Sequence, residues 1–210
     1  MERIREFLDK WVRRGFDPLL AVMERLGITP NHITVVAFLI NLGAAVLIVF
    51  GYYIWAASIF IVAGLLDLVD GSLARRTGRT TPFGSFLDST LDRLSEGAIF
   101  AAIAYRLAID QGVALQMRGV NVALVVLALL GSVTVSYTRA RAESLGVECR
   151  VGLASRFERI FLICVGLYQD VLPYVIYVML ALTMFTVIQR VVYTRRRLAI
   201  KEEEGGIVER

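Results

Sequence analysis

The residues that decide the fold are 67–92, which read DLVDGSLARRTGRTTPFGSFLDSTLD and contain four aspartates at helical spacing. Residues three or four positions apart are neighbours on one face of an α-helix. Two such faces combine acidic and small residues: Asp67, Asp70, Gly71 and Ala74 form the first, and Gly84, Asp88 and Asp92 form the second. If two helices with these faces pack antiparallel, four carboxylates converge beside three small residues.

The composition places these acids in a membrane protein. Of 210 residues, 57% are hydrophobic, and the mean hydropathy of +0.64 exceeds that of ordinary soluble domains. Apolar runs close to the roughly 20 residues that cross a bilayer recur along the chain. We predict an all-α polytopic membrane protein with six transmembrane helices preceded by an amphipathic surface helix. The expected spans are 33–50, 54–76, 82–108, 119–143, 156–168 and 173–197.

The first residues, 1–26, alternate basic side chains with apolar ones at helical spacing. This pattern is typical of a helix that lies on the membrane surface, and a solvated helix packed on the domain fits it equally well. The length suits one domain. We divide the chain into a juxtamembrane segment at 1–31, a six-helix transmembrane domain at 32–198 and a cytoplasmic tail at 199–210, which we expect to be loose.

Basic residues are strongly biased toward one set of helix ends. The opposite set of ends holds only Arg106 and Arg118. Because Lys and Arg concentrate in cytoplasmic loops, we expect an integral protein of the cell membrane with both termini and the acids on the cytoplasmic side. The formal net charge is only +4, and we expect no nucleic-acid partner.

Acidic side chains in a membrane span cost several kcal/mol each unless they are compensated, so the four aspartates are functional candidates. Two divalent cations balance four carboxylates, and such pairs recur in displacement reactions at phosphorus. The only histidine, His32, lies in another segment, and ligation by oxygen alone favours Mg²⁺ or Mn²⁺ over Zn²⁺. Cys149 and Cys164 lack metal-site spacing, so we expect packing residues without a disulfide. The small residues indicate either close helix packing or room for a ligand.

The pattern D-x-x-D-G-x-x-A-R-x8-G-x3-D-x3-D resembles the signature of the CDP-alcohol phosphotransferases. It is carried by Asp67, Asp70, Gly71, Ala74, Arg75, Gly84, Asp88 and Asp92. The resemblance implies transfer of a substituted phosphate from a CDP-linked donor to an alcohol, with release of CMP. It implies that Asp67, Asp70 and Asp88 bind metal and that Asp92 binds the second metal or acts as general base. It also implies that Gly71, Ala74, Arg75, Thr81 and Gly84 hold the cytidine diphosphate, with Thr29, Pro30, Asn31 and His32 closing over it.

Two later segments, SYTRARAE at 136–143 and RFER at 156–159, are similar to those of the phosphatidylinositol-phosphate synthase branch, which includes archaeal relatives with ether-lipid donors. That branch shows S-Y-x-K-A-R-A-E and R-P-E-R, so this chain differs at Arg139 and Phe157. The resemblance implies inositol phosphate as acceptor, its phosphate held by Arg139, Arg156 and Arg159. Glycerol 3-phosphate is the competing acceptor, and flanking charges with Arg–Glu pairs are the alternative interpretation of these arginines.

A cation transporter that uses intramembrane acids is the rival class. Transport sites lie near the bilayer midplane on broken helices, whereas these acids are expected at one membrane edge beside basic residues. The enzyme is therefore the better interpretation. Members of the resembling family are often homodimers, and small residues on the third and fourth spans allow the same here.

Overall fold

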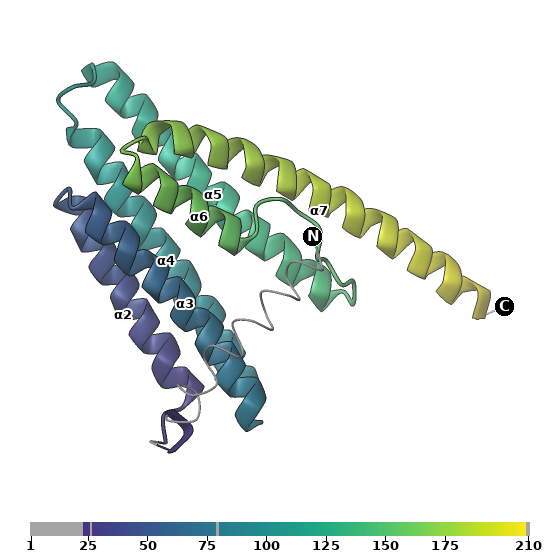
Figure 1. Cartoon of the computed structure of the whole chain (residues 1–210). Helices are drawn as coiled ribbons and strands as arrows, with labels where there is room; N and C mark the ends of the chain where they lie inside the picture. The colour runs from purple at the N-terminus through teal and green to yellow at the C-terminus, as the bar shows by residue number, and fades with distance from the viewer. Residues whose placement is uncertain (1–22, 26, 79, 209–210) are drawn as a thin grey trace.

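The computed structural model describes residues 23–25, 27–78 and 80–208, and Figure 1 shows them as a helical bundle. The main helices of this part are α2 (Pro30–Val49), α3 (Tyr53–Thr77), α4 (Pro82–Ile109), α5 (Leu115–Ser144), α6 (Arg156–Tyr168) and α7 (Leu172–Val208). The predicted surface helix falls on residues that lie almost wholly outside the described ones, so it stays a prediction.

Local sequence signals account for several helix boundaries. The Thr81 hydroxyl accepts a hydrogen bond from the Gly84 amide at 3.0 Å, and Pro82 follows as the first residue of α4, where the third span was expected to begin. Gly78 ends α3 with φ of +64°, which glycine adopts without strain. The tail expected to be loose is instead helical as far as Val208, because its Glu, Lys, Ala and Ile residues permit helix and no proline interrupts them.

Consecutive helices run in alternating directions (Figure 1). The beginnings of α2, α4 and α6 and the ends of α3, α5 and α7 therefore share one end of the bundle, here called the site end. Close packing pairs α2 with α3 and α4, α5 with α4 and α7, and α6 with α3 and α7. Within the described residues, α3 and α4 are not a closely packed pair, so their acidic faces meet across a space beside α2.

Four described helices are long and apolar enough to cross a membrane: Pro30–Val49, Tyr53–Ala74, Leu115–Ser144 and Leu172–Lys201. The remaining two differ for separate reasons. Five charged side chains interrupt α4, and α6 has 13 residues, about 20 Å of helix against a hydrocarbon core of about 30 Å. The polytopic all-α class is confirmed to this extent, and six spans stay a prediction.

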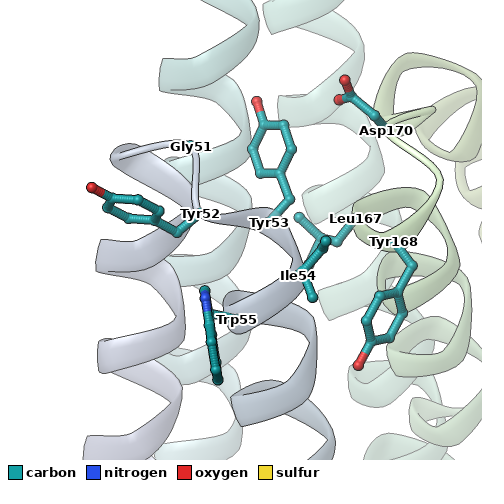
Figure 2. Close-up of a pocket in the computed structure, with 8 residues that line it drawn as sticks. All are labelled: Gly51, Tyr52, Tyr53, Ile54, Trp55, Leu167, Tyr168 and Asp170. Atoms are coloured by element: carbon teal, nitrogen blue, oxygen red, sulfur yellow. The ribbon is translucent and has the colours of Figure 1, made fainter.

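The end opposite the acids carries a pocket with aromatic walls, here called the aromatic pocket. Figure 2 shows Tyr52 on the turn before α3, Tyr53 and Trp55 at the start of α3, Tyr168 at the end of α6 and Asp170 on the turn into α7. The cavity measures about 550 Å³. Tyrosine and tryptophan favour the interface between membrane and water, so this end has the composition of a membrane boundary.

Candidate active site

The last third of α3 presents two acids on one face and apolar residues on the other. Val69 and Leu73 pack against Ile33 of α2, which orients the helix. Asp67 and Asp70 consequently share the face toward α4. Asp70 is only 6% exposed, and its Oδ2 accepts a hydrogen bond from the Thr34 hydroxyl at 2.7 Å.

The acidic face of α4 begins at Gly84 and continues through Asp88 and Asp92. A Cβ atom on Gly84 would lie 3.0 Å from the Thr81 hydroxyl and 3.1 Å from the Asn31 side-chain oxygen. Glycine therefore lets the first turns of α2 and α4 approach closely. The structure thus brings the predicted donor residues near Asn31 together with those near Gly84.

The N-terminal turn of α2 supplies the other residues predicted to close over the donor. Thr29 caps the helix, and its amide donates to His32 Nδ1 at 3.4 Å. Pro30 occupies the first helical position. Gly71 and Ala74 are partly exposed on α3, whereas the predicted contact of Arg75 falls on a side chain outside the described residues.

Arg156, the first residue of α6, joins the two acidic faces. Its Nη2 lies 2.8 Å from Asp67 Oδ2, and its Nη1 pairs with Asp92 Oδ2. Asp88 lies within electrostatic range of the same guanidinium. The four aspartates and Arg156 therefore form one charged group, here called the acid cluster.

A second network lies one helical turn deeper on α4. Glu96 receives two hydrogen bonds from Arg159, at 2.8 Å from Nε and 3.4 Å from Nη2, and one from the Ser132 hydroxyl at 2.5 Å. Arg159 is 2% exposed, and its Nη1 also donates to the Ala154 carbonyl at 2.9 Å. Sequence reasoning missed Glu96, although it extends the four-residue spacing of Asp88 and Asp92.

The remaining predicted acceptor residue, Arg139, is exposed and pairs with Glu143 at 2.8 Å. Arg190 of α7 was missed by sequence reasoning, because it merges with the basic run that follows it. It is 4% exposed and donates to the Val151 carbonyl at 2.9 Å and to the Val135 carbonyl. Among the described residues Arg190 forms no ion pair, and its charge lies within electrostatic range of Arg139.

The acid cluster has the donor chemistry that metal binding requires, but not the geometry of a formed metal site. The acid cluster offers carboxylates within electrostatic range of one another, which suits a hard divalent cation. In the described part of the chain, however, no three His, Cys, Asp or Glu side chains are placed to hold a metal ion together. Three of these carboxylates have other partners instead: Asp67 and Asp92 are paired with Arg156, and Asp70 accepts a hydrogen bond from Thr34.

A groove of about 560 Å³ opens from the acid cluster and runs between α3 and α6; it is here called the α3–α6 groove. Its polar end is lined by Asp67, Asp88 and Arg156. Its apolar walls are Ile61, Gly64, Leu65, Phe157, Ile160, Phe161, Cys164, Val165 and Tyr168. Beyond the last of these, the Tyr168 and Ser58 hydroxyls are hydrogen-bonded at 2.9 Å. A ligand with a charged head and a long apolar body fits this shape.

Residues 27–189 match the family model for CDP-alcohol phosphatidyltransferase. The chain belongs to this family. The predicted family is thereby confirmed, and the chain is a CDP-alcohol phosphotransferase of phospholipid biosynthesis. Members depend on divalent metal, which agrees with the donor chemistry of the acid cluster.

Curated relatives cover nearly the whole of this CDP-alcohol phosphotransferase. It is 40% identical over 193 residues to the archaetidylinositol phosphate synthase of Methanothermobacter thermautotrophicus, covering 89% of this chain and 92% of the relative. It is 35% identical over 193 residues to the phosphatidylinositol phosphate synthase of Corynebacterium glutamicum, covering 89% and 86% of the two chains. Both relatives are named as inositol phosphate enzymes.

Solved structures agree with the fold. The phosphatidylinositol phosphate synthase of Mycobacterium tuberculosis, in a crystal structure with CDP-DAG bound, superposes with a TM-score of 0.76 at 27% identity, covering 84% of this chain and 92% of that chain. A second crystal structure of that enzyme, in complex with manganese and citrate, gives the same TM-score and identity over 84% and 87% of the chains.

Proposed function

We propose that this enzyme transfers a phosphatidyl group, or its ether-lipid equivalent, from a CDP-lipid to a hydroxyl of inositol phosphate and releases CMP. The observation that carries the proposal is the α3–α6 groove, which leads from apolar walls directly to the acid cluster. A CDP-lipid has the same two parts, a charged diphosphate and long apolar chains. The relatives named as archaetidylinositol and phosphatidylinositol phosphate synthases support this choice of substrates.

The donor's cytidine diphosphate lies between the first turns of α2 and α4 and the last turns of α3. Gly71, Ala74, Arg75, Thr81 and Gly84 hold it, and Thr29, Pro30, Asn31 and His32 close over it. The close approach of Gly84 to Asn31 supports this arrangement, because it brings the two predicted groups into contact. The lipid chains extend from there along the apolar walls of the groove.

Asp67, Asp70, Asp88 and Asp92 hold two divalent cations, Mg²⁺ or Mn²⁺. When bound, these cations neutralise the diphosphate and stabilise the charge that develops on the transferred phosphate. Asp92 accepts the proton of the attacking acceptor hydroxyl, whose oxygen forms the new bond to phosphorus. The bond between that phosphorus and the oxygen of CMP breaks, and its electron pair leaves with CMP.

Arg139, Arg156 and Arg159 bind the acceptor's phosphate, since guanidinium groups match phosphate oxygens in planar pairs. Arg190 supports this pocket with a buried charge that makes no direct ion pair among the described residues, although Glu143 lies within its electrostatic range. Arg159 has five N–H groups, of which its bonds to Glu96 and Ala154 use three, so two are left for phosphate. Substituting Arg139 is expected to raise the KM for acceptor more than the KM for donor.

In the membrane, we propose six spans, with both termini and the site end cytoplasmic, and a homodimer. The aromatic pocket at the opposite end supports the orientation, because that end has few basic residues and several interfacial aromatic ones. Exposed apolar side chains on α4 and α5, such as Leu94, Val126 and Leu130, support a contact with a second copy or with lipid.

The decisive experiment is CMP release by the purified protein with Mn²⁺. A CDP-diacylglycerol and a CDP-dialkyl ether lipid are each combined with inositol phosphate, glycerol 3-phosphate or free inositol. We expect CMP and a phosphate-bearing lipid product only with inositol phosphate. Product formed only with glycerol 3-phosphate would identify that compound as the acceptor instead. Absence of CMP with every donor would overturn the proposed reaction itself.

A further inference from the structure

Arg156 holds a position that the proposed metal sites and the acceptor site both require. Among the described residues it is the only cation in contact with carboxylates of both α3 and α4. Arg93, the other cation nearby, lies 3.6 Å from Asp92 and belongs to α4 itself. The link between the two acidic faces therefore depends on one guanidinium that comes from a third helix.

The anchoring of Arg156 differs from that of its neighbour one turn along α6. Arg159 is buried and is held by both carboxylate oxygens of Glu96 and by a backbone carbonyl. The Arg156 side chain is 29% exposed, and its guanidinium pairs with the carboxylates of Asp67 and Asp92. Arg159 thus fixes α6, while Arg156 can exchange its partners without disturbing the helix.

We propose that Arg156 is a built-in counter-cation that competes with divalent cations for Asp67 and Asp92, and that cation binding releases its guanidinium to the acceptor's phosphate. This inference rests on the proposed function. A guanidinium and a divalent cation repel one another, and both neutralise the same carboxylates. Binding of one to these carboxylates therefore weakens binding of the other. The released guanidinium then neutralises the anionic acceptor instead of the aspartates.

This exchange has a thermodynamic consequence. If divalent cations free Arg156 for phosphate, the acceptor must in turn strengthen cation binding by the same factor, because coupling between two ligands is reciprocal. An arginine that only binds phosphate would leave cation affinity unchanged when it is removed. An arginine that only ties α6 to the acids would lower stability on removal without tightening cation binding.

The test is Mn²⁺ affinity, measured by electron paramagnetic resonance on the full-length protein without donor. Arg156→Gln is expected to lower the Kd for Mn²⁺ at least about tenfold, because a competing unit charge is lost. Arg156→Lys keeps the charge and should stay near wild type. Arg150→Gln is the matched control, since Arg150 is an exposed arginine that pairs with Glu148 outside the acid cluster. An equal or higher Kd in Arg156→Gln would overturn the proposal.

A second measurement uses inositol phosphate without donor. It should lower the Kd for Mn²⁺ in wild type and in Arg156→Lys but have no effect in Arg156→Gln, and equal coupling in all three would refute the release of Arg156. If Arg156→Gln does not fold, absence of coupling in wild type still overturns the proposal. Failure of the inference is separate from failure of the proposed function, because wild-type CMP release is measured independently of Mn²⁺ affinity.

Discussion

The two ends of the bundle handle polar groups in opposite ways. At the site end, the acids of α3 and α4 that meet the arginines of α6 are buried or half-buried, as are those arginines. At the aromatic end, the guanidinium of Arg106 lies over the ring of Tyr53 at 5.6 Å and donates to its hydroxyl at 2.9 Å. The first end brings opposite charges from three helices together, whereas at the second end Arg106 is paired with an aromatic ring instead of a carboxylate.

The difference shows where the fold tolerates the free-energy cost of burying charged side chains. Burying a charge is expensive unless it is paired, so a cluster of acids and arginines persists only where something requires it. An arginine stacked on tyrosine needs no carboxylate and stabilises the fold modestly. Variants at the site end should therefore affect turnover or stability strongly, and variants at the aromatic end should affect neither by much.

The largest effects are expected in the acid cluster. Asp67→Asn should lower kcat on the order of a thousandfold and weaken Mn²⁺ binding, because it removes a proposed metal ligand. Asp92→Asn should lower kcat on the order of a hundredfold or more by removing the proposed general base, while Mn²⁺ binding is weakened less. CMP release and Mn²⁺ titration of both variants test this, and equal loss of metal binding in both would contradict separate roles.

The next largest effect is expected for the hydrogen-bond network around Glu96. Glu96→Gln leaves the Arg159 charge buried without a counter-charge and should destabilise the fold by about 3 kcal/mol. Thermal unfolding in detergent measures this. The double variant Glu96→Gln with Arg159→Met removes the unpaired charge and should recover most of the loss. Without such recovery, the pairing of these two residues is not what stabilises α6.

A smaller, selective effect is expected in the α3–α6 groove. Gly64 lies in its wall, and a Cβ there meets Ile160 at 3.8 Å, so Gly64→Leu should fill the groove. The donor KM should rise about tenfold with little change in the acceptor KM, because about 1.4 kcal/mol of apolar contact is lost. Gly43→Leu is the control, because nothing lies within 4 Å of a Cβ on Gly43. Equal effects on both substrates would argue against a lipid groove.

The smallest effect is expected at the aromatic end. Tyr53→Phe removes the hydroxyl that accepts from Arg106 and should cost about 1 kcal/mol of unfolding free energy. The rate of CMP release should stay at the wild-type value. A loss of activity comparable to that of the acid variants would show that the two ends of the bundle are coupled.

Features that depend on neighbours along the chain were predictable. The pairing of Asp67 with Asp70 on one face and the cap at Thr81 follow from helix geometry. Both cysteines are buried, as expected of packing residues. The extent of α7 was not predictable in this way, because a run of charged residues at a chain end suits a loose tail and a helix alike.

Contacts between distant segments were not predictable in the same way. Glu96 meets Ser132 and Arg159, which are 36 and 63 residues away along the chain, and no local spacing encodes that meeting. The packing of α3 and α4 on α2 instead of on each other also depends on the whole bundle. As a result, the acids face one another across a space that Arg156 spans.

The sequence by itself determined the family and its reaction, because eight motif residues within 67–92 are tied to one another by covalent spacing and helical periodicity. Only the tertiary structure decided what each arginine does. Arg156 and Arg159 are three residues apart and looked equivalent, yet one bridges the aspartates and the other is buried against Glu96. The physical reason is that a side chain's charge partner is set by the helix packed opposite it, and that choice is made by the assembled fold.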